Sequence, residues 1–139
     1  MKRIFMTGKT KKNTEPIVDA IRKITRNGAV PLKIRCIYAD AAKQFNVSFF
    51  HESMSCGSEL PDMVHYRTNE LVYVIRGAVV VFLDSRRVPL KKGSCLFIPA
   101  GTAHRLKTGK QGMEAVSIFS PPIDPANPDA TLVRRGKTS

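Results

Sequence analysis

Short apolar segments separated by turn residues are the feature that most restricts how this sequence can fold. The segments cover residues 32–38, 45–49, 71–75, 78–83, 95–98, 104–107 and 113–119. In the first, Leu32, Ile34 and Cys36 alternate with Lys33 and Arg35, which is the period of a half-buried strand. Glycine, proline, aspartate and serine separate the segments. Many short strands at spacings of about 8–12 residues predict an all-β sandwich or small barrel.

One helix is expected before the strands, from Glu15 to Asn27. Pro16 would lie in its first turn, where the missing N–H costs nothing, and Gly28 would follow its end. The apolar stripe of this helix consists of Ile17, Val18, Ile21 and Ile24. We expect this stripe to pack against the body of the protein or against a second subunit.

The 139 residues divide into three parts by composition. We expect a basic N-terminal arm and helix over residues 1–30, a barrel over 31–120 and a Pro-rich extended tail over 121–139. The net charge of +12 is concentrated near the ends, because residues 1–35 carry ten basic and two acidic residues, or +8. Residues 36–133, with ten basic and nine acidic residues, are nearly neutral. No aromatic residues alternate with the N-terminal lysines, so the charge does not predict a single-strand binding platform.

Composition also bears on the cell compartment. No apolar run approaches the roughly 20 residues of a membrane-spanning helix. The charged start Met1–Arg3 is followed by only three apolar residues, fewer than the roughly 7–15 of a secretory signal. Three cysteines, Cys36, Cys56 and Cys95, are widely spaced and odd in number, which argues against a disulfide framework. We therefore expect a cytoplasmic protein with reduced cysteines.

Two motifs stand out within the strand region. The first runs Gly57-x5-Met63-x-His65-x4-Glu70-x6-Gly77, and the second runs Gly93-x5-Pro99-x-Gly101-x2-His104. Together they resemble the paired motifs of the cupin family, G-x5-H-x-H-x(3,4)-E-x6-G and G-x5-P-x-G-x2-H-x3-N. The spacings agree throughout, with Met63 in place of the first histidine and Thr108 in place of the final asparagine.

The resemblance implies an all-β fold, a double-stranded β-helix or jelly-roll barrel, with a pocket in its mouth. It also implies one divalent transition metal ion (Fe, Mn, Zn or Ni) held by His65, Glu70 and His104. Imidazole nitrogen and carboxylate oxygen suit such ions, and two histidines with one carboxylate on one face leave other positions open. An open coordination sphere is typical of a catalytic site.

Met63 departs from the family pattern. Thioether sulfur is a poor ligand for these ions, so we expect Met63 to line the pocket as an apolar wall. In another register, His65-x-Arg67 would form the histidine pair, with Arg67 in the second position and only two residues before Glu70. The Met63 register preserves both family spacings and is preferred.

Other residues are candidates for secondary roles, and no catalytic group is assigned. Arg67 lies near the site in either register, and its fork of donors suits an anionic substrate; an exposed loop residue is the alternative. Tyr66 and His51 are candidates for acid–base roles, and His51 for a fourth ligand. Phe97 is expected to line the pocket with Met63.

The family hosts many activities, so fold does not settle function. The leading hypothesis is a metal-dependent enzyme, of dioxygenase, isomerase or decarboxylase type, that acts on a small polar or anionic metabolite. The alternative is a non-catalytic small-molecule-binding or sensor protein with a degenerate metal site. We expect a homodimer that binds a small molecule, with no membrane partner and no nucleic-acid partner despite the basic N-terminus.

Overall fold

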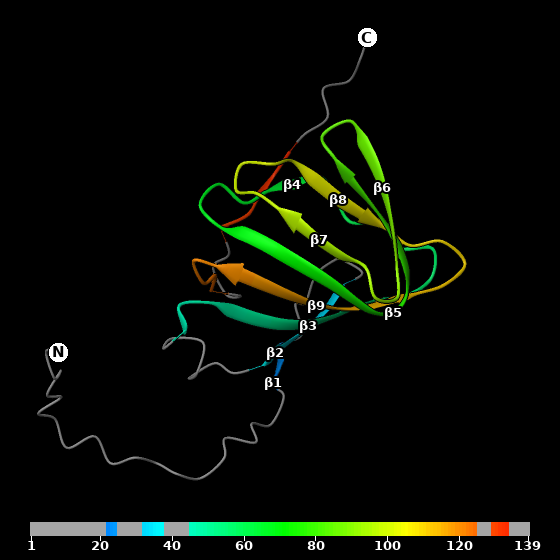
Figure 1. Ribbon diagram of the computed structural model, residues 1–139, viewed down its shortest axis with the longest axis horizontal. Helices are drawn as coiled ribbons and strands as arrows, with labels where there is room; N and C mark the ends of the chain where they lie inside the picture. The colour runs from blue at the N-terminus through cyan, green and yellow to red at the C-terminus, as the bar shows by residue number, and fades with distance from the viewer. Residues whose placement is uncertain (1–21, 25–31, 38–44, 125–128, 134–139) are drawn as a thin grey trace, which may run out of the picture.

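The computed structural model describes residues 22–24, 32–37, 45–124 and 129–133. These residues form ten β-strands, all paired antiparallel (Figure 1). The strands are β1 (Arg22–Ile24), β2 (Leu32–Ile37), β3 (Ser48–Met54), β4 (Met63–Val64), β5 (Asn69–Leu83), β6 (Arg86–Lys91), β7 (Cys95–Ile98), β8 (His104–Lys107), β9 (Met113–Ser120) and β10 (Thr131–Leu132). The fold is the all-β barrel expected from the alternating segments.

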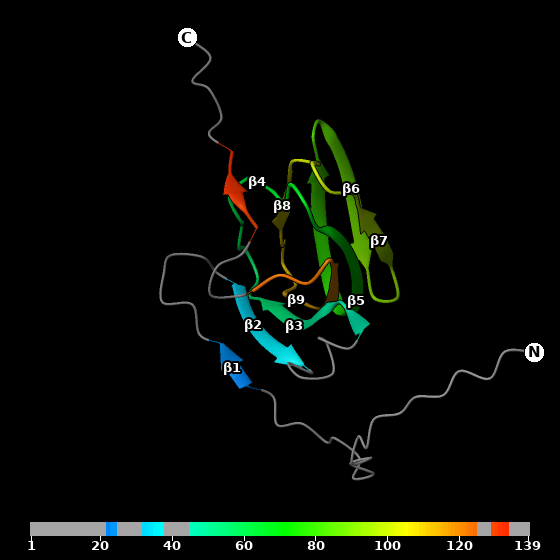
Figure 2. The same cartoon turned by 90° about the vertical axis from the view of Figure 1, so that its left-hand side faces the viewer.

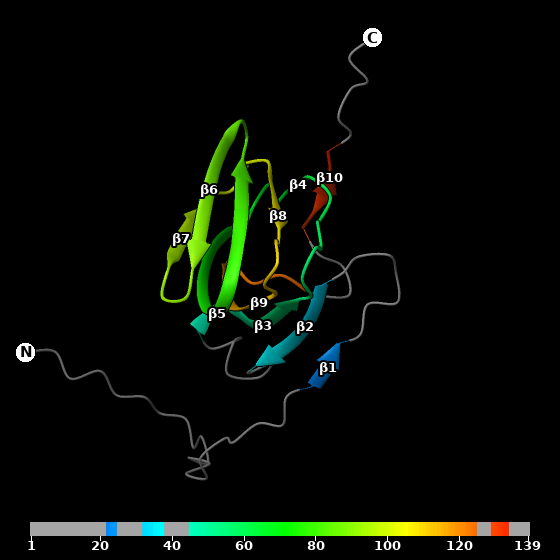
Figure 3. The same ribbon diagram turned by 90° about the vertical axis from the view of Figure 1, so that its right-hand side faces the viewer.

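The strands form one curled sheet in the order β1-β2-β3-β9-β5-β8-β4-β10, and β6 and β7 also pair with β5. The first part of β5 pairs with β7 and β9, whereas its last part pairs with β6 and β8. Figures 2 and 3 show that the sheet closes on itself, with β6 and β7 on the side opposite to β4 and β10. The inner face of this curl is therefore enclosed by both halves of the sheet.

Gly77 makes the long strand β5 possible. The sequence pattern predicted two strands, 71–75 and 78–83, separated by a turn at Arg76-Gly77. Instead the chain continues through a bulge between Val74 and Arg76, and Gly77 takes a φ of 77°. A Cβ at Gly77 would lie 1.9 Å from the Gly112 carbonyl oxygen. Gly77 thus lets β5 bend from one half of the sheet to the other, as bulges do at barrel corners.

Two further expectations on strand boundaries need correction. The strand predicted over 45–49 is displaced to Ser48–Met54, where every second residue is buried. Arg22–Ile24, inside the predicted helix 15–27, form β1 and pair with β2. Pairing with β2 satisfies the backbone N–H and C=O groups along the edge of the sheet. This gain outweighs the weak preference of Arg22–Ile24 for a helix. The rest of the predicted helix lies outside the described residues.

The inner face carries a continuous apolar core. Its fully buried members include Val72 and Val74 on β5, Val81 further along β5, and Ala115 on β9. Strands with buried residues at every second position, such as β3 and β9, supply one face to this core and the other to the surface. Within the parts of the chain that the structure describes, no helix has the length and hydrophobicity needed to cross a bilayer.

Candidate metal centre

The two sequence motifs meet at one end of the barrel. The turn of the second motif binds the first, because Gly101 N–H donates to the His65 carbonyl (2.7 Å) and Ala100 N–H donates to Asn69 Oδ1 (2.9 Å). Met63 on β4 also pairs with His104 on β8. These contacts bring His65, which directly follows β4, next to His104, at the start of β8.

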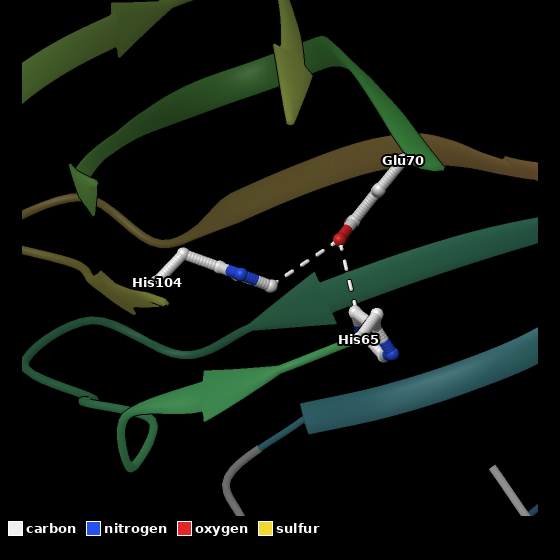
Figure 4. Close-up of side chains that lie close together, drawn as sticks. All are labelled: His65, Glu70 and His104. Carbon is white, nitrogen blue, oxygen red and sulfur yellow. Dashed lines mark ion pairs between the residues drawn. The ribbon is translucent and has the colours of Figure 1, made fainter. Parts of the chain in front are cut away.

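His65, Glu70 and His104 form a compact buried cluster (Figure 4). Glu70 Oε2 lies 3.4 Å from His104 Nε2 and 3.9 Å from His65 Nε2. One ligand atom from each residue lies within 4.8 Å of the other two. The three side chains are 2–8% exposed, so their polar atoms face one another rather than solvent.

The imidazoles of His65 and His104 both direct Nε2 toward Glu70. His65 Nδ1 lies 2.7 Å from the Asp129 carbonyl oxygen, and His104 Nδ1 lies 2.9 Å from the Thr102 carbonyl oxygen. A carbonyl oxygen only accepts hydrogen bonds, so each Nδ1 carries the proton. In the neutral rings Nε2 therefore carries the free lone pair, and both lone pairs are available beside the Glu70 carboxylate.

This donor set fits a first-row transition metal ion. Two imidazole nitrogens and one carboxylate oxygen match the preference of these ions. Metal-bound histidines usually donate their second ring N–H to a carbonyl or carboxylate, as both rings do here. The cluster thus has both the ligand atoms and the outer hydrogen bonds of a metal centre.

The protonation of His104 reflects its neighbours. Burial lowers the pKa of His104, but the Glu70 carboxylate, the Thr102 carbonyl and the charge of Asp62 more than offset this, so the pKa lies above its ordinary value. In the metal-free protein, a proton on His104 would compete with a cation for the same nitrogen. Metal binding at this cluster would accordingly weaken as the pH falls.

Glu52 is a second buried carboxyl group that the sequence reasoning did not single out. It lies on the inner face of β3 and is 5% exposed. Burial, together with the charge of Glu70, raises the pKa of Glu52 from an ordinary value of 4.5 to about 8. Neither motif contains Glu52, and it lies beyond the strand predicted over 45–49; in the observed strand β3, Glu52 faces inward and His51 faces outward.

The secondary candidates lie in a loop beside the cluster, on the outer face of the sheet and against the core. Arg67 is at the rim of the site with its side chain 84% exposed, and Tyr66 beside it is 60% exposed. His51 lies on the outer face of β3 with its Nε2 3.6 Å from Glu114 Oε2, so the sheet separates it from the three candidate ligands. Met63 is half-buried and packs against the core.

The expectation that Phe97 lines the pocket is wrong. Phe97 is 56% exposed on β7, and it pairs with Leu71. Its neighbour Ile98 pairs with Glu70 and is 1% exposed. Because successive residues of a strand point to opposite faces, Ile98 faces inward with Glu70 and Phe97 faces outward.

Two residues that the motifs do not contain complete the surroundings of His65. The Phe119 ring on β9 meets the His65 ring edge to face, at 5.4 Å between centroids and 70°. Asp129, near the C-terminus, supplies the carbonyl partner of His65. Only the tertiary fold brings them here, because they follow His65 by 54 and 64 residues.

Comparisons with known proteins agree with this architecture. A family profile described as "Cupin domain" matches residues 50–119. An uncharacterized protein, MJ1618, of Methanocaldococcus jannaschii is 24% identical over 100 residues, which are 71% of this chain and 78% of that protein.

Two solved structures have a similar fold. One is PAC13 from Streptomyces, determined with uridine, with a TM-score of 0.66, 18% identity and coverage of 82% of this chain and 85% of that one. The other is a predicted oxalate decarboxylase from Thermotoga maritima, with a TM-score of 0.59, 20% identity and coverage of 64% and 79%. The profile matches half of the sequence and includes both motifs and all three clustered residues. The chain belongs to the cupin family.

Proposed function

We propose that this protein binds one divalent transition metal ion through His65, Glu70 and His104 and acts as an enzyme on a small polar or anionic metabolite. The observation that supports this most directly is the convergence of both Nε2 atoms on one carboxylate oxygen inside the barrel. A buried carboxylate beside two imidazoles would be costly without a cation or proton to balance it.

The residues around the cluster suit a small anionic ligand. A bound divalent cation would act as a Lewis acid toward a substrate carboxylate, carbonyl or hydroxyl oxygen. Phe119 provides an apolar wall beside His65, and Arg67 places a cationic group at the rim. The similarity in fold to a predicted oxalate decarboxylase agrees with a carboxylate-bearing substrate. We propose a reaction of the dioxygenase, isomerase or decarboxylase type.

Metal content of the untagged protein tests the first part of this proposal. We expect about one ion of iron, manganese, zinc or nickel per chain by elemental analysis. His65→Ala and His104→Ala should each reduce the content to background, because each removes one of three ligands. Met63→Leu is the matched control: it removes the sulfur, keeps the volume and should retain the ion. A protein that stays empty and gains no thermal stability from added metal ions would refute the proposal.

A non-catalytic binding protein is the second candidate. Methionine at position 63 supports it, since a family histidine is missing there and a weakened site suits binding more than turnover. Metal-loaded protein that binds small carboxylates in calorimetry but converts none of a panel of organic acids and sugar acids would favour this reading over an enzyme.

A further inference from the structure

The C-terminal residues 129–133 return to the first motif from far along the chain. Thr131 and Leu132 form β10, which pairs with Val64 and Met63 of β4. Val133 N–H also donates to the Asp62 carbonyl (2.9 Å). In Figure 3, β10 lies beside β4 at the edge of the sheet. The last described residues therefore form the outermost strand immediately next to His65.

Asp129 contacts the chain on both sides of Tyr66. Its carbonyl oxygen lies 2.7 Å from His65 Nδ1, and its carboxylate Oδ2 accepts the Arg67 backbone N–H at 2.7 Å. Arg67 Nε lies 3.9 Å from the same oxygen. The Asp129 side chain is 15% exposed, and charge-assisted bonds to backbone N–H groups are stronger than neutral ones. Asp129 thus contacts both His65, a candidate ligand, and Arg67, two residues further along the chain.

The two histidines differ in how their outer hydrogen bonds are supplied. The partner of His104 is Thr102, two residues earlier on the same turn. The partner of His65 is Asp129, 64 residues away, which precedes the short strand β10 by two residues. The outer hydrogen bond of His65 therefore comes from a distant part of the chain, whereas that of His104 is local.

We propose that Asp129 is a positioning residue for the metal centre. Its carboxylate anchors the C-terminal segment to Arg67 N–H, so that its carbonyl holds His65 with Nδ1 protonated and Nε2 directed toward Glu70. Insofar as it concerns metal affinity, this inference rests on the proposed function. Asp129 is then a part of the surroundings of the metal site, although it lies outside both sequence motifs.

Asp129→Ala tests the role of the carboxylate. Loss of an outer-shell partner typically costs about 10–100-fold in metal affinity, and we expect a loss in that range with one site per chain retained. Binding is measured by titrating Zn²⁺ into chelator-treated protein in a calorimeter, and Co²⁺ absorption reports the ligand geometry. Asp129→Asn should restore most of the affinity, because its side-chain oxygen still accepts the Arg67 N–H. Thr131→Ala, an exposed change on β10, is the matched control and should leave the affinity unchanged.

A second readout needs no metal. Nitrogen chemical shifts of the His65 ring in metal-free protein distinguish a protonated Nδ1 from a protonated Nε2. We expect the Nδ1–H form in the wild type and in Asp129→Asn, and a mixture of both forms in Asp129→Ala. Thermal unfolding of each variant shows whether the barrel remains folded.

The two readouts separate the failure of this inference from that of the proposed function. If Asp129→Ala keeps the wild-type tautomer and, where metal binds, the wild-type affinity, Asp129 does not position His65. If no variant binds metal, the wild type included, the proposed function fails, and the ring shifts alone decide the role of Asp129. If Asp129→Ala does not fold, Asp129→Asn is the variant to examine. A folded Asp129→Asn that loses the Nδ1–H form of His65 would contradict our assignment of the Asp129 side chain as a simple hydrogen-bond acceptor.

Discussion

At the scale of single residues, Glu52 has the most unusual environment. Its carboxyl group is buried on the same inner face as Glu70, and its pKa is raised to about 8. Between about pH 5 and 8 the folded protein therefore keeps a proton that the unfolded chain, with a pKa near 4.5, has lost. The stabilisation from this proton is complete below the unfolded pKa and is lost as the pH rises toward about 8.

Glu52→Gln should remove this dependence, because glutamine has similar size and does not ionise. In chelator-treated protein, the free energy of unfolding of the wild type should fall with pH relative to the variant, by at most about 1.4 kcal/mol per pH unit for one proton. Urea titrations at pH 5, 6, 7 and 8 measure the difference. Glu114→Gln, on the outer face of β9, is the control. Parallel pH profiles for wild type and Glu52→Gln would show that Glu52 is ionised in the folded state.

At the scale of elements, the bend in β5 carries the most structural constraint. Gly77 combines a φ of 77° with a backbone neighbour at 1.9 Å from an added Cβ. Gly93, in the turn before β7, has a similar φ of 86° but open space around it. Alanine variants at Gly77 and Gly93 therefore separate two contributions to the loss of stability: the strain of a side chain at positive φ, and the steric overlap with Gly112.

Gly93→Ala should destabilise the protein by about 1–3 kcal/mol, the cost of a side chain at positive φ. Gly77→Ala should cost considerably more, because β5 and the backbone at Gly112 must move apart to make room for the added Cβ. Thermal and urea unfolding of the two variants measure the difference. Equal losses of stability would mean that the close approach of Gly112 relaxes at no cost.

At the scale of the whole molecule, the outer face of the sheet exposes a band of apolar side chains. Leu71, Tyr73 and Ile75 on β5 are 36–48% exposed, and Phe97 on β7 is 56% exposed. Paired strands continue the band, since Leu71 pairs with Ile118 on β9. Exposed apolar patches of this kind mark interaction sites. Arg76 and Glu114, which form an ion pair at the margin, provide both signs of charge for pairing across a two-fold axis.

We expect this face to join two copies of the chain. Tyr73→Glu would bury an unpaired charge in the interface and should shift the protein from dimer to monomer, as measured by light scattering with size-exclusion chromatography. Leu132→Glu, 63% exposed on β10, is the control and should stay dimeric. A monomeric wild type that loses stability on Tyr73→Glu would indicate that another part of this chain covers the face instead.

Much of the fold and the centre of the site could be predicted from the sequence by itself. The spacing of the glycines, the histidines and Glu70 determined the two motifs, and each of the glycines Gly57, Gly77, Gly93 and Gly101 takes a positive φ. The alternation of apolar residues determined β7, β8 and β9 closely. The resemblance of these motifs to those of the cupin family implied His65, Glu70 and His104, which cluster in the structure. These features depend on local geometry, which the order of residues encodes directly.

Only the tertiary structure decided the rest. A period of two shows which residues share a face, but packing decides which face is inward, so Glu52 and Ile98 face the interior while His51 and Phe97 do not. Backbone pairing decided that β5 bends at Gly77 without ending and that Arg22–Ile24 form an edge strand. Asp129 reaches His65 through a backbone carbonyl, a group that every residue possesses. Such long-range backbone contacts have no residue signature, and this is why the sequence predicted the clustered residues His65, Glu70 and His104 but not the contact of Asp129 with His65.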